Sequence, residues 1–335
     1  MADSKTIAFW CERAEGSGET AAEFHVNLWH FSKKNRADFF EIGILPDDPG
    51  ALSAIKIYVP FSISSSDVRD LGPEFASTEL AQGIFNETLS STRRPSGKCV
   101  ELRNGNSVYC QVHIFSPDGA KIDPDELTLK SMDGGTLLTI TQQALTTLAR
   151  QSEEANRGYF RLRISPKTRG GRPFITTIKP KDRAWKSGFD VIEYIDCRIN
   201  EARTLPTSVE TAADSTPHGV TLTSRVVFLA VVPVVSSVTS SHAEWHKSRL
   251  LENEIWQNYV PDGLEDGMVV YHWRKDFEGD TSKPLHGFSA FVKMQTHRSG
   301  LLVISLYLIM AFLLGVTGSL SASYFQLYFN SLGGP

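Results

Sequence analysis

The stretch 301–320, LLVISLYLIMAFLLGVTGSL, contains no charged side chain. At a rise of about 1.5 Å per residue, a helix of this length covers the roughly 30 Å of hydrocarbon in a bilayer. A helix buried in a protein core is usually shorter and keeps a polar face. The sequence therefore predicts one transmembrane helix, within a membrane region at residues 297–330.

The residues that flank this stretch predict its orientation. Lys293, His297 and Arg298 precede it, whereas no charged side chain follows Arg298. Positive charges mark the cytoplasmic side of a span. The N-terminus has no basic stretch followed by an apolar run, so no cleaved signal is expected. We expect a single-pass protein with its N-terminal domain in the cytoplasm, in the inner membrane if the source is bacterial.

Small side chains recur every four residues along the predicted span, at Ala311, Gly315, Ser319 and Ser323. Such a stripe lets two helices approach closely in lipid, where hydrophobicity does not drive association. Small residues are also common in membrane helices that form no interface. The four positions are the candidate interface of a homo-oligomer.

The residues before the span have the composition of a globular protein. Of the 335 residues, 41% are hydrophobic and 21% are charged, which is close to the average for soluble domains. The net charge of -4 lacks the strong positive balance of an indiscriminate nucleic-acid binder. We expect a β-rich domain at 1–130 and an α+β domain at 131–296, or one unit continuous through both.

Strand patterns dominate this region. Short alternating or β-branched runs bounded by turn residues predict strands at 22–31, 39–46, 53–63, 107–116, 159–164, 174–178, 189–199, 220–235 and 268–273. Helical periodicity predicts helices at 76–90, 135–156 and 242–259, and 204–219 has the composition of a loop. The valine-rich run 226–235 is short and interrupted by Pro233, which favours a buried strand over a second span. The predicted fold class is α+β, with a single C-terminal transmembrane helix.

A hairpin is predicted within residues 98–115. Asn104-Gly105 is the favoured dipeptide of a two-residue type I′ turn, and a turn there would set Cys99 opposite Cys110. In a reducing cytoplasm we expect both to remain free thiols.

Basic residues gather between 161 and 186, against the single acid Asp182. On a strand, Arg161 and Arg163 share one face, the backbone at Gly170-Gly171 could approach a phosphate, and Trp185 could stack on a base. A phosphate-bearing ligand is the leading interpretation, beside a solvated charged face or attraction to anionic lipids. The candidate ligand-binding residues are Arg161, Arg163, Lys167, Arg169, Arg172, Lys179, Lys181 and Arg183, followed along the chain by Lys186.

Catalytic motifs are not evident. His242 and His246 flank Glu244 at a spacing that would place two imidazoles on one helix face, but the HExxH order and a third ligand are missing. No GxSxG or kinase motif occurs. The sequence assigns no catalytic residue, metal or cofactor, and an enzyme is not expected.

In its order of parts, a β-rich region with a basic segment and then one self-associating helix, the chain resembles membrane effectors of bacterial antiphage defence systems, such as Hailong-type or cyclic-nucleotide-triggered channel effectors. The resemblance implies an oligomeric channel or pore opened by a nucleotide or oligonucleotide. Two other hypotheses remain: a tail-anchored adaptor that recruits a protein partner, and a membrane-anchored hydrolase that uses His242, Glu244 and His246.

Overall fold

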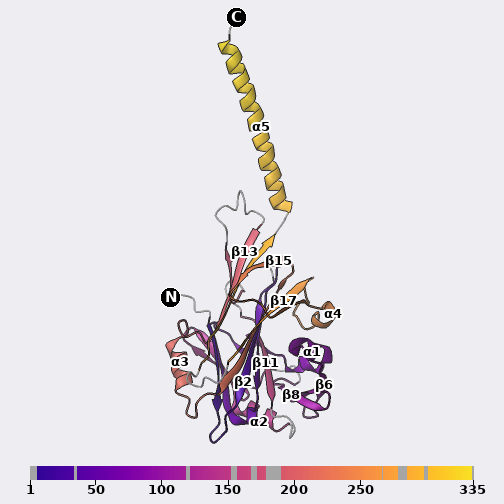
Figure 1. Cartoon of the computed structure of the whole chain (residues 1–335), viewed down its shortest axis with the longest axis vertical. Coiled ribbons are helices and arrows are strands. Elements are labelled where there is room, and N and C mark those ends of the chain that lie inside the picture. The colour runs from indigo at the N-terminus through magenta and orange to yellow at the C-terminus, as the bar shows by residue number, and fades with distance from the viewer. Residues whose placement is uncertain are drawn as a thin grey trace.

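In the computed structural model, two large β-sheets pack face to face and one long helix, α5, projects from one end (Figure 1). The structure describes residues 6–33, 36–117, 121–151, 157–166, 172–178, 190–265, 267–277, 285–297 and 301–333. The predicted α+β class, rich in strands and with few helices, is confirmed.

The first sheet has the strand order β15-β18-β13-β1-β4-β10-β9, and β12 pairs with the outer part of β13. Its strands are β1 (Thr6–Arg13), β4 (Leu52–Val59), β9 (Leu127–Met132), β10 (Gly135–Ile140), β12 (Ile175–Ile178), β13 (Asp190–Ile199), β15 (Ser236–Ser241) and β18 (Phe288–His297). Among the described strands of this sheet, β1 and β13 are the only parallel pair.

The second sheet has the order β16-β17-β14-β2-β3-β11-β8-β7-β6, and β5 pairs with β11. Its strands are β2 (Ala21–Trp29), β3 (Phe39–Pro46), β5 (Val68–Asp70), β6 (Ser90–Arg93), β7 (Cys99–Asn104), β8 (Ser107–His113), β11 (Gly158–Ile164), β14 (Leu222–Pro233), β16 (Lys247–Leu250) and β17 (Met268–Asp276). Each sheet contains strands from 1–130 and from 131–296, so residue 130 does not separate two sheets.

The main core lies between the sheets and follows from the alternation of apolar residues along the strands. Phe9 of β1 and Phe24 of β2 stack across it with ring centroids 3.6 Å apart. Residues 226–235 fall largely in β14, whose Val226 and Phe228 are fully buried. The prediction of a buried strand there is confirmed.

Short helices cover the sandwich, and several differ from the sequence predictions. They are α1 (Thr78–Phe85), α2 (Gln142–Ala149), α3 (Thr207–Asp214) and α4 (Asn253–Trp256), with 3-10 turns η1 (Pro49–Ala51), η2 (Ser65–Asp67) and η3 (Gly72–Ala76). The helix predicted at 76–90 corresponds to α1. The one predicted at 135–156 begins with β10, where Thr136, Leu138 and Ile140 are buried at a period of two.

The other two errors are explained by tertiary contacts. The helix predicted at 242–259 is wrong over most of its length, because Lys247–Leu250 pairs with β17 as a strand and only α4 is helical. The predicted loop at 204–219 contains α3, whose Val209 and Ala213 lie four residues apart and pack on Trp10 and Tyr58. Burial of that face stabilises a helix in a sequence of weak helical propensity.

The hairpin at 98–115 is formed, but its register differs from the prediction. Asn104 pairs with Ser107, so Gly105 and Asn106 form the turn, and of these two only Gly105 has a positive φ (57°). A type I′ turn needs positive φ at both residues. A bulge between Leu102 and Arg103 shifts the pairing further, so Cys99 lies opposite His113. All four cysteines are buried and free.

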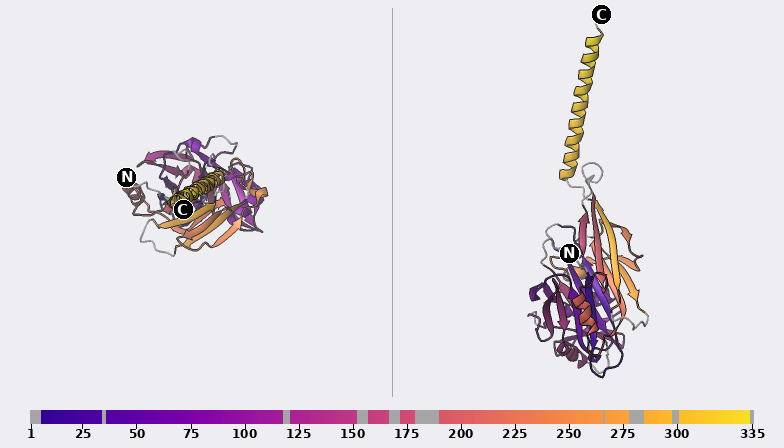
Figure 2. Two further views of the ribbon diagram at one scale, coloured as in Figure 1. Left: turned by 90° about the horizontal axis from the view of Figure 1, so that it is seen from above. Right: turned by 90° about the vertical axis from the view of Figure 1, so that its left-hand side faces the viewer.

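Helix α5 (Leu301–Leu332) stands clear of the sandwich in the right-hand view of Figure 2. It is the one helix among the described residues that is long and apolar enough to span a membrane, and none of its span at Ile304–Leu332 is buried in the protein. The alternative of a buried core helix is therefore wrong. The Thr317 hydroxyl donates to the carbonyls of Leu313 and Leu314, so the helix itself satisfies this polar group.

Candidate functional site

The structure places the first two candidate ligand-binding arginines in a buried ion network on β11. Their neighbours Phe160, Leu162 and Ile164 face the main core, as predicted, but the opposite face is buried as well. Glu41 accepts hydrogen bonds from Arg161 Nη2 at 2.6 Å and Arg163 Nε at 2.9 Å. Burial opposes ionisation of Glu41, but the two arginines outweigh it and lower its pKa. Both guanidinium groups are therefore engaged with a carboxylate of the protein.

Arg172 also faces carboxylates of the protein. It pairs with Glu193 and lies near Asp38, beside the buried imidazole of His30. The remaining candidates, Lys167, Arg169, Lys179, Lys181 and Arg183, lie outside the described residues, as do Lys186, Gly170-Gly171 and Trp185. Of the predicted ligand-binding residues that the structure describes, Arg161 is the one that lines the pocket described next.

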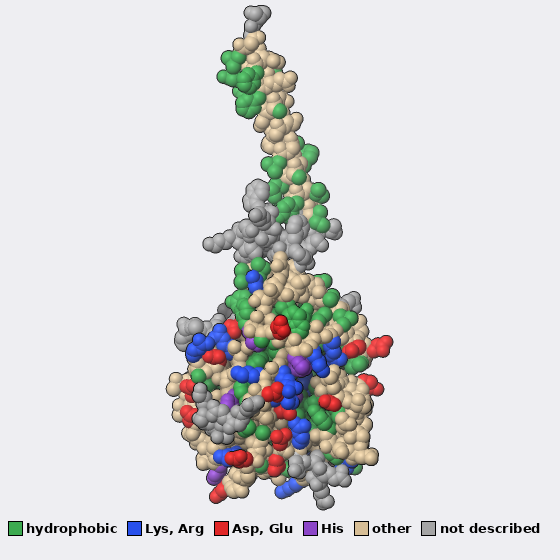
Figure 3. All heavy atoms as spheres, viewed as in Figure 1, with side chains coloured by type: hydrophobic (Ala, Val, Ile, Leu, Met, Phe, Trp, Pro, Cys, Tyr) green, Lys and Arg blue, Asp and Glu red, His purple; other side chains and the backbone are tan. Residues whose placement is uncertain are grey.

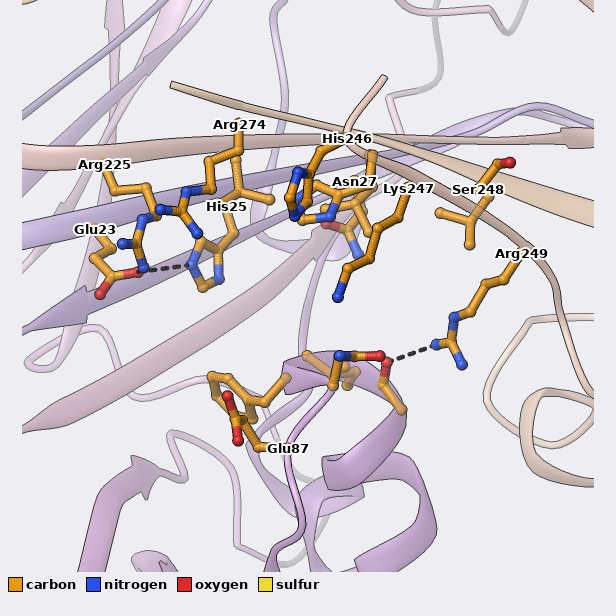
Figure 4. Close-up of a pocket in the computed structure, with 18 of the residues that line it drawn as sticks. Glu23, His25, Asn27, Glu87, Arg225, His246, Lys247, Ser248, Arg249 and Arg274 are labelled. Carbon is orange, nitrogen blue, oxygen red and sulfur yellow. Dashed lines mark hydrogen bonds and ion pairs between the residues drawn. The ribbon is translucent and has the colours of Figure 1, made fainter. Parts of the chain in front are cut away.

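This pocket, of about 560 Å³, lies between the outer face of the second sheet and the end of α1 (Figure 4). Its floor is formed by β2, β14, β17 and β16, and Gly83–Glu87 form the opposite wall. The Ser77 hydroxyl caps the start of α1 by accepting a hydrogen bond from the Leu80 amide. Asn86, with a φ of 55°, ends the helix and turns the chain along the pocket.

The pairing of four strands arranges the floor in rows. Because alternate residues of a strand share a face, every second residue points toward the pocket. One row crosses the sheet through Asn27, Leu229, His272 and Lys247. The next contains His25, Val227 and Arg274, and a third contains Glu23 and Arg225.

The lining of the pocket has more positive than negative side chains. Five are cationic and two are acidic, which gives a net formal charge of +3 with histidines neutral. The cationic residues are Arg161, Arg225, Lys247, Arg249 and Arg274, and the acidic residues are Glu23 and Glu87. Glu41 behind Arg161 and Asp276 beside Arg225 and Arg274 offset part of this charge, and the charge that remains favours an anionic ligand at the Lys247 end of the pocket.

Carboxylates also hold Arg225 and Arg274 in place. Arg225 lies between Glu23 Oε2, at 3.2 Å from Nη1, and Asp276 Oδ1, at 2.6 Å from Nε. Arg274 Nε is 2.7 Å from the other oxygen of Asp276. Burial opposes ionisation of Glu23, but His25, Arg225 and Arg157 outweigh it and lower its pKa to about 2.

Lys247 and His272 carry polar groups that the described residues of the protein do not pair. The Lys247 ammonium extends toward the wall formed by the end of α1 (Figure 4), and no described residue forms an ion pair with it. Nε2 of His272 is buried without a hydrogen-bond partner among the described residues. A buried polar atom without a partner costs about 1–3 kcal/mol, so a ligand that contacts it recovers part of this cost.

The electrostatic environment of His272 is positive. Burial is the main cause that lowers its pKa to about 4, and His246, His25, Lys247 and Arg274 add to the effect. The His246 and His272 rings are nearly perpendicular, with centroids 5.6 Å apart. The imidazole is therefore neutral at pH 7, in a position where an anion would be stabilised.

The proposed metal-binding pair is not on a helix. His242 and His246 lie in the bends between β15 and β16, and His242 Nδ1 accepts a hydrogen bond from the Phe291 amide at 3.3 Å. His246 borders the anion pocket instead. Within the described residues, no group of three His, Cys, Asp or Glu side chains is arranged to hold a metal ion.

Sequence reasoning missed most of this pocket because its residues come from seven separate segments. The available signal was local: Glu23, His25 and Asn27 alternate with buried apolar residues, as do His272 and Arg274. In comparisons with known proteins, no protein-family model and no curated sequence matches the chain.

Proposed function

We propose that this chain is a single-pass membrane effector whose extramembrane domain binds a phosphate-bearing ligand in the pocket beside α1. Two neighbouring groups in a lining of net positive charge carry the proposal. Lys247 lies opposite His272 in the β16–β17 register, and Nε2 of His272 has no hydrogen-bond partner among the described residues. Phosphate oxygens accept hydrogen bonds from lysine, arginine and a neutral imidazole N–H.

The rest of the lining suits a nucleotide or oligonucleotide. Val227, Leu229 and Val270 supply apolar floor, and Tyr109 supplies an aromatic ring. A volume of about 560 Å³ lies within the range of small-molecule sites. We therefore expect the phosphate to lie near Lys247 and Arg225 and the base to lie near the apolar side chains of the floor.

Membrane anchoring follows from the exposure of α5. Its apolar side chains are unburied along the whole span, and leaving apolar surface in water costs about 25 cal/mol per Å². Lys293, ahead of the helix, favours a cytoplasmic location for the domain.

A continuous path joins the pocket to the helix. Strand β14 carries Arg225 into the pocket and continues through Val234-Val235 into β15, which pairs with β18. Strand β18 leads directly to α5. Ligand binding can shift α5 only if the ligand prefers one of two arrangements of these strands.

Oligomerisation is the second part of the proposal. Ala311, Gly315, Ser319 and Ser323 lie on α5, and no atom outside the helix backbone approaches the Cβ position of Gly315 within 4 Å. A second helix can occupy that space. We propose that several α5 helices assemble into a channel or pore that ligand binding opens.

The proposal is tested with the full-length protein in liposomes loaded with a potassium-sensitive dye. Inorganic phosphate, ATP, and cyclic and linear dinucleotides are added as probes. We expect at least one probe to open an ion flux that Lys247→Met abolishes and that Lys130→Met, at an exposed lysine outside the pocket, preserves. If no probe changes the flux, ligand gating is wrong.

Cross-linking in detergent tests the assembly separately. Gly315→Leu is expected to weaken the oligomer, whereas Leu313→Ile, off the stripe, is expected to leave it intact. A monomer by light scattering, together with unchanged activity in cells after replacement of α5 by polyleucine, would instead favour the tail-anchored adaptor.

A further inference from the structure

The described residues outside α5 include six large hydrophobic side chains that are exposed, and four of them gather at one end of the domain. These four are Ile178 (44% exposed), Val234 (55%), Val235 (58%) and Leu250 (57%). The other two are Trp245 and Phe291. Scattered exposed apolar residues are ordinary, but a gathering at one end indicates an interaction surface.

The strand registers locate this end next to α5. Ser236, directly after Val235, lies opposite Thr296 of β18. Ile178 lies opposite Ile192, which lies opposite Gln295 of β18. Because β18 ends at His297 and α5 begins at Leu301, these apolar residues surround the point where the chain leaves for the helix.

Leu250 belongs to the same end through the second sheet. It lies opposite Val269, one residue from Met268, which lies opposite Pro233. The Val234-Val235 corner therefore connects the two sheets on the side that faces α5. Figure 3 shows charged side chains over the body of the domain, whereas the described atoms just below the grey residues, toward α5, are mainly hydrophobic and uncharged.

Specific contacts with Gly267 define the conformation of the corner. The Val234 amide donates to the Gly267 carbonyl at 2.6 Å. Gly267 has a φ of 67°, and a Cβ there would lie 2.7 Å from Val234 Cγ1. Because residue 267 is a glycine, Val234 can pack tightly against its backbone while both valines stay exposed.

The distance to the membrane is limited by the chain. Leu301 follows Thr296 by five residues, and an extended chain covers at most about 3.6 Å per residue, so Thr296, which lies opposite Ser236 next to the corner, is within about 18 Å of the start of α5. The headgroup layer adds roughly 5–8 Å to each side of the hydrocarbon. The connection is therefore short enough for the corner to reach the surface of the bilayer that α5 enters.

We propose that the Val234-Val235 corner, flanked by Ile178 and Leu250, is a lipid-contacting surface that enters the headgroup layer beside α5. This inference rests on the membrane anchoring by α5 proposed above, but it needs no ligand and no channel. Its consequence is a second attachment point that fixes the tilt of the domain. The corner also joins β14, which borders the pocket, to β15, so lipid contact acts on the path from ligand to helix.

Fluorescence quenching in nanodiscs tests the proposal with the full-length protein. An environment-sensitive dye is attached to the cysteine of one of three variants. These are Val235→Cys, Ser240→Cys at the end of β15 farther from α5, and Leu313→Cys within α5. The four native cysteines are buried. Lipids with a spin label near the headgroup are expected to quench the dye at 235 at least about twofold more than the dye at 240, as for an apolar group buried 5–10 Å in the interface.

Each alternative has its own result. Equal quenching at 235 and 240, with strong quenching at 313 by lipids labelled along the chain, would overturn the lipid contact and leave the anchoring intact. No quenching at 313 would overturn both. If dilution with unlabelled protein, rather than spin-labelled lipid, changes the emission at 235, the surface binds a second copy of the chain and the lipid proposal is wrong.

Discussion

Ser236 and Thr296 face each other across the β15–β18 pair, with their hydroxyl oxygens 2.7 Å apart and both side chains buried. Ser236 follows the end of β14 by three residues, and Thr296 precedes α5 by five. One hydrogen bond therefore connects the strand that borders the pocket with the strand that continues into the helix.

Thr296→Val is expected to destabilise the domain by about 1–3 kcal/mol, because it leaves the Ser236 hydroxyl buried without this partner. Adding Ser236→Ala should cost less than the sum of the two single changes, since the unsatisfied group is then removed. Thermal unfolding in detergent measures this double-mutant cycle. Strictly additive effects would show that the two hydroxyl groups do not interact.

Glu41→Gln is expected to lower the free energy of unfolding by roughly 3–5 kcal/mol, because Arg161 and Arg163 lose their buried counter-charge. Glu201→Gln is the control, since its partner Arg203 is 85% exposed, and such surface pairs contribute at most about 1 kcal/mol. Thermal unfolding of both variants tests the structural role of the network. Comparable losses would contradict it.

Anion binding to the pocket is expected to strengthen as pH falls from 7 to 5. Sulfate near His272 raises the pKa of that imidazole from about 4, so binding takes up a proton and lower pH favours the bound state. Sulfate keeps its charge over this range, and isothermal titration calorimetry measures its affinity. His272→Asn should reduce the slope, and an unchanged slope would assign the proton to another group, such as His25.

Helices and strands could be predicted where the pattern that specifies them lies within their own residues. The uncharged run at 301–320 predicted α5, and the alternation in residues 22–31 predicted β2. The parallel pairing of β2 with β14 could not be predicted, because it joins segments about 200 residues apart. The same limit explains the helix predicted at 135–156, where pairing with β4 and β9 favoured a strand for β10.

The site shows why charge along the sequence is an incomplete guide. Arg161 and Arg163 stood out in the sequence, yet both are buried against Glu41, a residue some 120 positions away. His272 and Lys247 belong to unremarkable segments and become neighbours only through the β16–β17 register. Predicting the pocket therefore required the sheet order, which depends on non-local packing.

The last prediction concerns the stability of the domain at alkaline pH. His30 lies between Asp38 Oδ2 at 3.0 Å and Glu193 Oε2 at 3.2 Å and is almost fully buried. Burial opposes its charge, but the two carboxylates outweigh it and raise the pKa of His30 to about 9. This contribution to stability is full below the ordinary pKa of 6.5 and is lost as pH rises through about 9. Glu193, with its pKa lowered to about 2, contributes to stability above pH 4.5 and loses this contribution only in strong acid.

The melting temperature should therefore decline between pH 6.5 and 9, and His30→Gln should flatten this decline while lowering stability at pH 6. The exposed His218→Gln is the control, and an equally steep decline in both variants would show that the His30 cluster does not set the alkaline limit.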